Sequence, residues 1–420
     1  MKVKNLQIQE IVYLVALFIA LLLMRRFDQV LHPDVWTEDG AFNITSYIHL
    51  GWANLLEPVQ GYLITISKLI TDTSLWISFM YYPEISTILA WLFTIFVSLV
   101  IVYAPTVLPY RIVAAVMIYM VPAYGEPYGI PLFTFWFAGL FVLLVLLWKQ
   151  GEHLVFKNIL LVIGGLSSPV IVVAIPAQIY RLFIFKEKKE ELTSLFIMFF
   201  LAAVQLLTMM HTGAVDASDK VSFTALLSHI HISDYITFFF GKYYMGAFLM
   251  DDYSRWITND YYLMYAGGVF FLCIIVVYFY INRKDPYLYI FLYLLFAMLA
   301  IVLYRVGFEV ARLSPRYFFY VSIMQSWLLL YMMRGLPLLR YIIVPILIFS
   351  VITALGIYSK KSDTLKWHTH VLECRDSSEL LYSIPIHYAG WKEDTWHISI
   401  KPETCQKLLA NDMLYTEVKK

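Results

Sequence analysis

The sequence is 420 residues long, 60% hydrophobic and 17% aromatic, yet only 15% of its residues are charged and its formal net charge is +1. Soluble domains typically contain about one quarter charged residues, so this composition excludes an ordinary soluble protein. No region carries the dense positive charge that phosphate contacts require, which argues against a general nucleic-acid binder. Continuous apolar runs of about 20 residues instead predict a polytopic helical membrane protein.

The first apolar run, at residues 6–24, follows Lys2 and Lys4 and therefore has the layout of a signal peptide. Because Arg25 and Arg26 follow it and no small-residue cleavage site does, we interpret it as an uncleaved first membrane helix. The further predicted membrane helices are 84–103, 108–122, 131–148, 157–166, 169–184, 192–210, 262–281, 286–305, 316–333 and 340–358. The sequence thus predicts an all-α fold with 10 or 11 crossings, depending on whether the pair broken at Gly164–Pro169 counts as one or two.

The distribution of basic residues predicts the orientation of these helices. Lys and Arg concentrate in short connections on the side of the N-terminus, whereas the two long loops on the opposite side, 25–83 and 211–261, carry only three each. Loops rich in Lys and Arg usually face the cytoplasm. We therefore expect a protein of the cell membrane with a cytoplasmic N-terminus and with both long loops and the C-terminal segment outside.

The composition changes sharply after Tyr358, which divides the chain into a transmembrane domain, 1–358, and a polar segment, 359–420. Leu381–His387 and Thr395–Ile400 have the pattern of short strands. We expect a small extracytoplasmic α+β domain that rests on the membrane domain, because about 60 residues bury too little surface for independent stability.

The chain has three cysteines. Cys273 lies in an apolar segment, where we expect it to pack in the core. Cys374 and Cys405 share the polar C-terminal segment. A disulfide between them is plausible if that segment is outside the cytoplasm, and two unrelated thiols are the alternative.

Two adjacent carboxylates, Glu38 and Asp39, follow the first helix in the sequence Trp-Thr-Glu-Asp-Gly. Residues 41–56 then alternate apolar and polar groups with the spacing of a helix that lies in the membrane interface, and Gly61–Ile70 begins a second amphipathic piece. Considered alone, the acidic pair is explained by an ordinary helix N-terminus, where carboxylates cap backbone amides. The alternative is a catalytic site beside the membrane surface.

Four short motifs bear on this choice: Trp36–Gly40, Pro58 followed by Gly61-Tyr62, Gly165–Pro169, and Ser314–Tyr317 before a late helix. Together with the long acidic first outer loop, the many helices and the outward C-terminal segment, they resemble the GT-C glycosyltransferases. The resemblance covers nearly the whole chain, although each motif is short. It implies transfer of a hexose or pentose from a polyprenyl-phosphate carrier, on the extracytoplasmic face, to a cell-envelope glycan, a lipid-linked saccharide or a protein.

The resemblance also implies roles for particular residues. The family places an Asp in this loop as the catalytic base, and Asp39 occupies that place; Glu38 is the second candidate, as base or as ligand to a metal or a hydroxyl. We expect Arg316, Arg312 and Tyr317 to bind the donor phosphate, because guanidinium groups match phosphate oxygens. The alternative is that these arginines extend to lipid headgroups or pair with a nearby glutamate.

Some GT-C enzymes use a divalent cation, but the sequence has no second acidic cluster clear enough to assign a metal site. Two other functions remain alternatives. A transporter or flippase for lipid-linked saccharides would place ionisable groups near helix midpoints and would show paired repeats. A polysaccharide polymerase also combines many helices with arginine-bearing outer loops, but its large loop usually comes late in the chain.

Overall fold

The computed structural model describes residues 2–120, 127–212, 261–306, 315–355, 365–386 and 396–416. The chain is mostly helical, and every predicted membrane segment contains a helix. These helices are α1 (Lys2–Leu31), α4 (Tyr82–Tyr103), α5 (Arg111–Met117), α6 (Thr134–Leu146), α7 (Leu154–Ser167), α8 (Val170–Ile184), α9 (Lys188–His211), α13 (Tyr261–Ile281), α14 (Pro286–Val306), α15 (Phe319–Gly335) and α16 (Arg340–Leu355).

Within the described part of the chain, three helical stretches are long and apolar enough to cross a membrane: Ile8–Leu31, Tyr82–Tyr103 and Lys188–His211. Of the others, α5, α6, α8 and α15 are shorter than predicted, whereas α7, α13 and α14 are longer. The largest difference is in the predicted segment 108–122, where α5 has only 7 residues and starts after Tyr110 in the left-handed region. The composition of a segment therefore identifies it as apolar but does not fix how far the helix extends.

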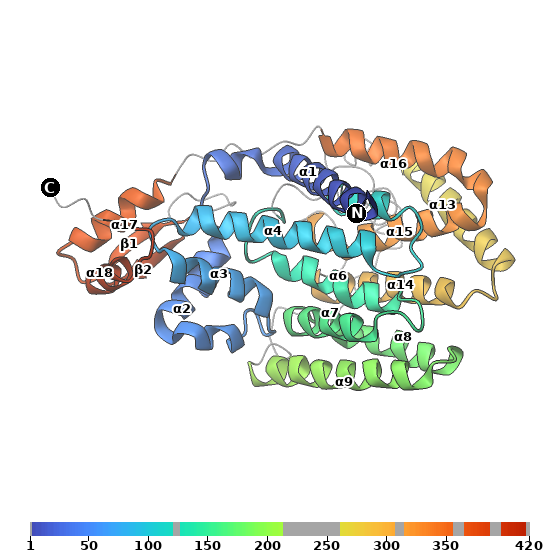
Figure 1. Ribbon diagram of the computed structural model, residues 1–420, viewed down its shortest axis with the longest axis horizontal. Helices are drawn as coiled ribbons and strands as arrows, with labels where there is room; N and C mark the ends of the chain where they lie inside the picture. Colours follow the sequence, from blue (N-terminus) through green and yellow to red (C-terminus); the bar gives the residue numbers. More distant parts are fainter. Residues whose placement is uncertain are drawn as a thin grey trace.

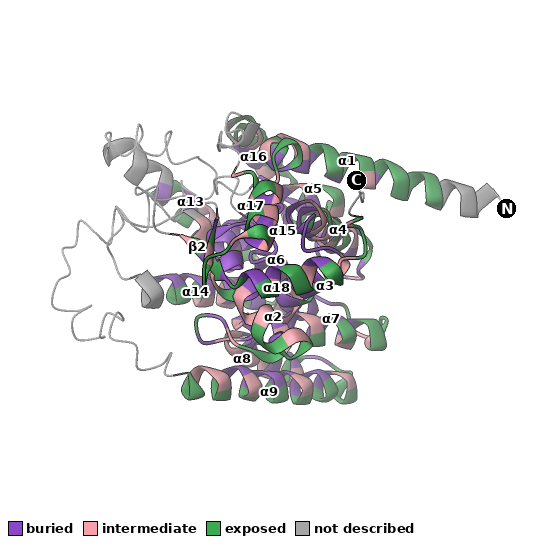
Figure 2. Ribbon diagram, turned by 90° about the vertical axis from the view of Figure 1, so that its left-hand side faces the viewer, coloured by how far each residue is buried: buried purple, intermediate pink, exposed green. Residues whose placement is uncertain are grey.

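The core is built around α6, in which every residue is buried. Figure 1 shows α6 between α4 and α7, with α8 and α9 beyond them, and α6 packs against α4, α7 and α8. Close approach requires glycine here, since a Cβ on Gly164 would lie 2.8 Å from the backbone oxygen of Ala138. Figure 2 shows the result, with α6 buried in the middle and exposed faces on α1 and α9.

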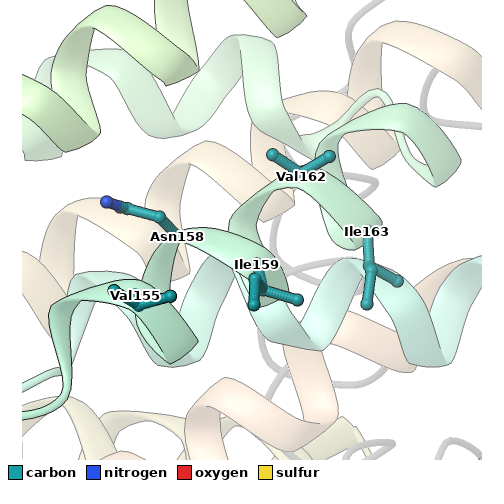
Figure 3. A pocket seen from close by; sticks show the side chains of 5 residues that line it. All are labelled: Val155, Asn158, Ile159, Val162 and Ile163. Atoms are coloured by element: carbon teal, nitrogen blue, oxygen red, sulfur yellow. The ribbon is translucent and has the colours of Figure 1, made fainter.

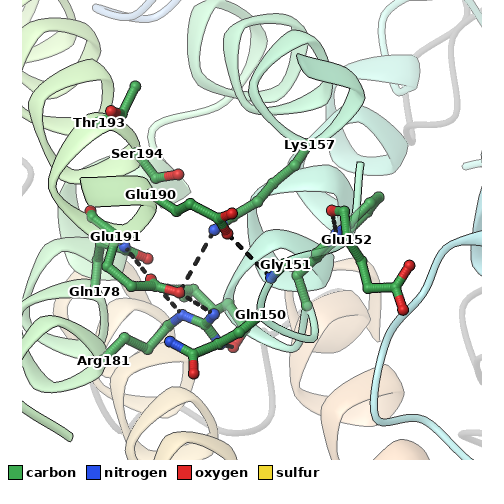
Figure 4. A network of polar contacts seen from close by, with 12 residues as sticks. Gln150, Gly151, Glu152, Lys157, Gln178, Arg181, Glu190, Glu191, Thr193 and Ser194 are labelled. Atoms are coloured by element: carbon green, nitrogen blue, oxygen red, sulfur yellow. Dashed lines mark hydrogen bonds and ion pairs between the residues drawn. The ribbon is translucent and has the colours of Figure 1, made fainter. Parts of the chain in front are cut away.

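A buried ionic network joins α7, α8 and α9 (Figure 4). Arg181 donates from Nη2 and Nε to the carboxylate oxygens of Glu191, at 2.6 and 2.9 Å, and the amide of Gln178 donates to the same carboxylate at 2.7 Å. The ammonium of Lys157 lies 3.7 Å from Glu191. The three charged residues are at most 2% exposed, so each depends on the others for compensation.

The first loop forms a chain of short helices: η1 (Asp39–Ile44), a π-helix, then α2 (Thr45–Leu50), η2 (Gly51–Leu56) and α3 (Thr65–Ile77). The predicted helix at 41–56 is thus helical throughout but changes type twice, and it bends at Gly51, whose φ is +57°. Figure 1 shows α2 and α3 at the same end of the molecule as the C-terminal segment.

The C-terminal segment contains α17 (Trp367–Asp376), an antiparallel pair of strands, β1 (Tyr382–Pro385) and β2 (His397–Ile400), and α18 (Pro402–Ala410). It is anchored to the loop between α3 and α4. Asp412 accepts hydrogen bonds from the Ser78 hydroxyl at 2.7 Å and the Met80 amide at 2.9 Å, while the Trp367 indole donates to the Phe79 carbonyl at 3.1 Å.

Cys374 and Cys405 form a disulfide that links α17 to α18. This decides between the two possibilities left open by the sequence. The expectation for Cys273 is wrong, since this residue is exposed on the outer face of α13. On an apolar helix in a membrane protein, the outward face is as apolar as the inward one, so composition alone did not distinguish them.

Replacing both Cys374 and Cys405 with alanine is expected to destabilise the C-terminal segment by about 3–4 kcal/mol, because the disulfide closes a long loop in the unfolded chain. The two cysteines are 31 residues apart. Protease sensitivity of the C-terminal segment in the purified protein measures the effect. Cys273→Ala serves as the matched control, and equal sensitivity of all three proteins would contradict the prediction.

Candidate functional site

Asp39 is the first residue of η1 and is only 1% exposed. Its Oδ1 accepts a hydrogen bond from the side-chain amide of Asn43 at 2.9 Å, and its Oδ2 accepts one from the backbone N–H of Leu132 at 3.2 Å. Glu38 occupies the N-cap position but makes no capping bond, and it is half-exposed. Neither carboxylate therefore caps a backbone amide of this helix, although Asp39 lies in its first turn.

Burial raises the pKa of Asp39 to about 7, and the negative charge of Glu38 adds to the rise. The hydrogen bonds from Asn43 and Leu132 act in the opposite direction because they stabilise the ionised form. A carboxyl group with a pKa near neutrality can both accept and release a proton under physiological conditions, which is the property required of a general base.

The turn that holds Asp39 also contacts Arg316. The guanidinium of Arg316, in η5 (Pro315–Phe318), lies 5.7 Å from the ring centre of Phe133 and 5.6 Å from that of Tyr317. Phe133 directly follows Leu132, whose N–H binds Asp39. The structure thus brings Asp39 and Arg316, which lies beside Tyr317, to one turn at Leu132 and Phe133 from two distant parts of the sequence. Arg312 lies outside the described residues.

The first loop is fastened to the broken helix pair α7 and α8. The hydroxyl of Thr65 donates to the Leu166 carbonyl at 3.0 Å, and the Ile66 N–H donates to the Ser167 hydroxyl at 3.2 Å. Gln205 of α9 exchanges hydrogen bonds with both backbone groups of Leu63, at 3.0 and 3.2 Å. The backbone carbonyls of Gly165 and Leu166 at the break are thereby hydrogen-bonded by side chains of the protein itself.

The next residues of α3 support the turn at Asp39. Ser67 donates to the Leu132 carbonyl at 2.7 Å and accepts from the Phe135 N–H at 3.1 Å. The same turn is therefore held from two sides, by Asp39 on its backbone N–H and by Ser67 on its carbonyl. The position of Asp39 follows from packing between η1, α3 and the start of α6.

Sequence reasoning missed a second polar cluster beside Asp39. Asn54, Lys68 and Asp72 are each 0% exposed. Asn54 accepts a hydrogen bond from the Lys68 ammonium at 2.5 Å, and its amide donates to Asp72 at 2.7 Å and to the Asn43 backbone carbonyl at 3.2 Å. The available signal was the Lys-Asp pair spaced four residues apart in the otherwise uncharged stretch 63–77, since that spacing places both on one helix face.

Burial lowers the pKa of Lys68 to about 8, against the opposing effects of Asp72 and Glu57. Burial raises the pKa of Asp72 to about 6, against the hydrogen bond from Asn54 and the charge of Lys68. Three titratable groups of the first loop thus have pKa values close to neutrality. Clusters of perturbed pKa values are more frequent at functional sites than elsewhere.

The outer surface of the first loop is apolar although its interior is polar. Trp52 is 45% and Leu56 71% exposed, and Trp76 packs beside Trp52 with their ring centres 6.5 Å apart. Asn43 and Asn54 point inward. This inverted arrangement is typical of helices that lie on a membrane surface, where the apolar face enters the lipid.

The C-terminal segment packs against η1 from the other side. A Cβ on Gly40 would lie 2.6 Å from Cδ1 of Ile386 and 3.2 Å from Cδ1 of Ile398. Only glycine therefore fits directly after Asp39 without displacing these side chains. The segment after β1 and the strand β2 thus help to fix the backbone that carries the candidate base.

An apolar pocket on the exposed face of α7 lies apart from this site. It is lined by Val155, Asn158, Ile159, Val162 and Ile163 (Figure 3), which carry no titratable or nucleophilic group.

Among the described residues, no three His, Cys, Asp or Glu side chains come together as a metal site. The oxygens of Asp39 are already engaged by amide donors, so these residues do not fit a divalent cation.

Comparisons of the chain with protein-family models, with curated proteins and with solved structures each found no match.

Proposed function

We propose that this chain is a membrane glycosyltransferase of the GT-C type that transfers a sugar from a polyprenyl-phosphate donor to a hydroxyl acceptor at the extracytoplasmic face. The observation that carries the proposal is that the buried carboxyl of Asp39, with a pKa of about 7, and the guanidinium of Arg316 contact adjacent residues, Leu132 and Phe133. A base and a cation that contact adjacent residues of one turn meet the two needs of the reaction: removal of the acceptor proton and stabilisation of the leaving phosphate.

The proposed reaction is a single displacement. The acceptor hydroxyl gives its proton to Asp39 while its oxygen forms a bond to the anomeric carbon, and the bond from that carbon to the phosphate oxygen breaks. The electron pair of that bond leaves with the polyprenyl phosphate, and Arg316 stabilises the resulting charge. One displacement inverts the anomeric configuration.

The position of the site also supports the proposal. The exposed aromatic face formed by Trp52 and Trp76 would enter the membrane surface and bring the site to the depth of a lipid phosphate. A transporter would carry buried charges near the midpoints of its helices. The buried charges of the described helices lie elsewhere, which does not favour that alternative. In the described helices α7, α8 and α9, Lys157, Arg181 and Glu191 each lie about one turn from a helix end.

The test uses lipids extracted from a strain that lacks this protein, because these lipids should contain the unused donor. The envelope fraction of the same strain supplies the acceptor. When the purified native protein is added to both, we expect a polyprenyl-phosphate-linked sugar to be consumed and the polyprenyl phosphate to be released, as followed by mass spectrometry. Unchanged lipids would overturn the proposal. A lipid-linked saccharide that accumulates only on the cytoplasmic side in intact cells would indicate a flippase instead.

A further inference from the structure

Asn54 lies on the inner side of η2, a short helix whose outer side is apolar. It is 0% exposed, whereas Trp52 and Leu56 of the same helix are exposed. Burying an amide costs free energy unless its polar atoms are hydrogen-bonded. Both polar atoms of the Asn54 side chain have partners, and these partners lie on η1 and α3. Asn54 is therefore the point at which η1, η2 and α3 are joined.

The hydrogen bonds of Asn54 all run to named atoms of these elements. Its side-chain nitrogen donates to the backbone carbonyl of Asn43 at 3.2 Å and to Oδ1 of Asp72 at 2.7 Å, and its side-chain oxygen accepts from the Lys68 ammonium. An amide nitrogen carries two hydrogens, so both are used. Two bonds fix Asn54 to α3, and the remaining hydrogen holds Asn43 of η1.

Asn43 connects this cluster with the candidate base. It is 0% exposed, and its side-chain nitrogen donates to Oδ1 of Asp39 at 2.9 Å. Its side-chain oxygen has no hydrogen-bond partner in the described part of the chain, so no further side-chain bond fixes this amide. The direction in which it donates therefore depends on the backbone of Asn43, whose carbonyl is held by Asn54.

A reversal of the chain at Gly51, between α2 and η2, makes this contact possible. The φ of Gly51 is +57°, in the left-handed region that glycine adopts without strain. A Cβ at this position would meet no other atom, so the backbone conformation and not the available space favours glycine. The reversal brings Asn54 back onto Asn43, 11 residues earlier in the chain.

We propose that Asn54 is a positioning residue that holds the backbone of Asn43 so that the side-chain amide of Asn43 donates to the carboxylate of Asp39. The inference rests on the proposed function only where it names Asp39 as the base. The bond from Asn43 favours the ionised carboxylate and lowers its pKa, whereas burial raises it. Without this bond, Asp39 stays protonated to higher pH, where a protonated carboxyl cannot act as a base.

Few other titratable groups act on Asp39. Glu38 lies beside it in the chain, and Tyr82 acts on it from the start of α4. The start of α6 contributes a backbone N–H, and the C-terminal segment packs isoleucine side chains against this turn. Lys68 and Asp72 of α3 bond to Asn54. Glu38 and Tyr82 stay unchanged in the experiment that follows, so they cannot cause a difference between variants.

The experiment titrates the Asp39 carboxyl group by infrared spectroscopy in the full-length protein in lipid nanodiscs. The carboxyl band that is lost in Asp39→Asn identifies the group, and its intensity is followed against pH. Asn54→Leu keeps a similar shape but has no amide, and it is expected to raise the pKa of Asp39 by about 1 or more. Asn43→Leu, which removes the donor itself, should raise the pKa at least as far.

The two substitutions together distinguish positioning from a direct effect. If Asn54 acts through Asn43, Asn54→Leu adds no further rise to a protein that already carries Asn43→Leu. The direction of the change distinguishes positioning from a general loosening of η1. Water that enters the turn would lower the pKa of Asp39 towards its ordinary value of 3.8, whereas the loss of one donor in a buried site raises it.

Lys68→Met provides the matched control. Asn54→Leu alone leaves the Lys68 ammonium in the interior without its hydrogen-bond partner, so the comparison is repeated with Lys68→Met in both proteins. Lys68→Met alone keeps the bond from Asn54 to Asn43 and reports any effect of the lost charge. Adding Asn54→Leu to it should again raise the pKa of Asp39. Thermal unfolding of each protein confirms that it folds.

An unchanged or lowered pKa of Asp39 in the Asn54→Leu proteins would overturn the proposal. A full additional rise in the protein that carries Asn43→Leu would also overturn it, because Asn54 would then act by another route. The measurement involves no sugar transfer. A raised pKa in a protein that transfers no sugar would leave the positioning role standing while refuting the proposed function.

Discussion

Asp39→Asn is expected to lower the rate of sugar transfer by about 10²–10⁴-fold, the usual contribution of a general base. Asparagine has nearly the same shape as aspartate but cannot accept the acceptor's proton. In the native protein, the rate should rise with pH up to the pKa of Asp39, about 7, as the carboxyl ionises. This rise should be absent from the residual activity of the variant.

The same substitution is expected to stabilise the fold above neutral pH. The pKa of Asp39 is raised from 3.8 to about 7, so the folded protein binds this proton more tightly than the unfolded chain does. Stability is therefore lost as pH rises from about 4 through 7, and the loss is on the order of 4 kcal/mol at about 1.4 kcal/mol per pKa unit. Asparagine at position 39 avoids this loss because it carries no charge to bury.

Thermal unfolding measured across pH checks this prediction: the advantage of Asp39→Asn should be largest above pH 7 and vanish below about pH 4. Glu38→Gln is the control, because Glu38 is half-exposed and holds no capping bond. It should change the stability far less than Asp39→Asn does, while the loss of its negative charge should lower the pKa of Asp39 and move the rise in rate to lower pH. Full activity of Asp39→Asn at a native protein level would refute the catalytic assignment.

Glu191→Gln is expected to cost about 3–5 kcal/mol of stability, because it leaves Arg181 and Lys157 charged in the interior without a counter-ion. Arg181 is 0% exposed and also donates to the Leu146 carbonyl at 2.8 Å, so it cannot turn towards solvent. Glutamine keeps the length of the side chain, and the effect therefore isolates the charge. Denaturant titration of the purified protein in micelles measures the free energy of unfolding.

Glu187→Gln supplies the matched control on an exposed residue just before α9, and it should change stability by no more than about 0.5 kcal/mol. If both variants unfold alike, the network at Glu191 does not stabilise the helices. Transfer activity should fall only as far as folded protein is lost, since the network lies away from Asp39.

The sequence predicted the helices and the two short strands because these features depend on local composition and periodicity. It also predicted that Asp39 and Arg316 lie on the same face, through the expected orientation of the loops, but it did not predict that both contact the turn at Leu132 and Phe133. It did not identify Asn54, Lys68 and Asp72 as a buried cluster, because a Lys-Asp pair on one helix face is more often a solvated surface pair. Local composition also did not predict the lengths of helices such as α5, because packing against the rest of the protein decides where a helix ends.

The sequence by itself determined that this chain is rich in apolar helices and that an acidic pair follows the first of them, because hydrophobicity is a property of each segment alone. Only the tertiary structure decided the state of that pair. Burial and hydrogen bonding set the pKa of Asp39, and its backbone donor, Leu132, lies 93 residues away. Such an environment is created when η1, α3, the start of α6 and the C-terminal segment pack together, so no stretch of the sequence contains it.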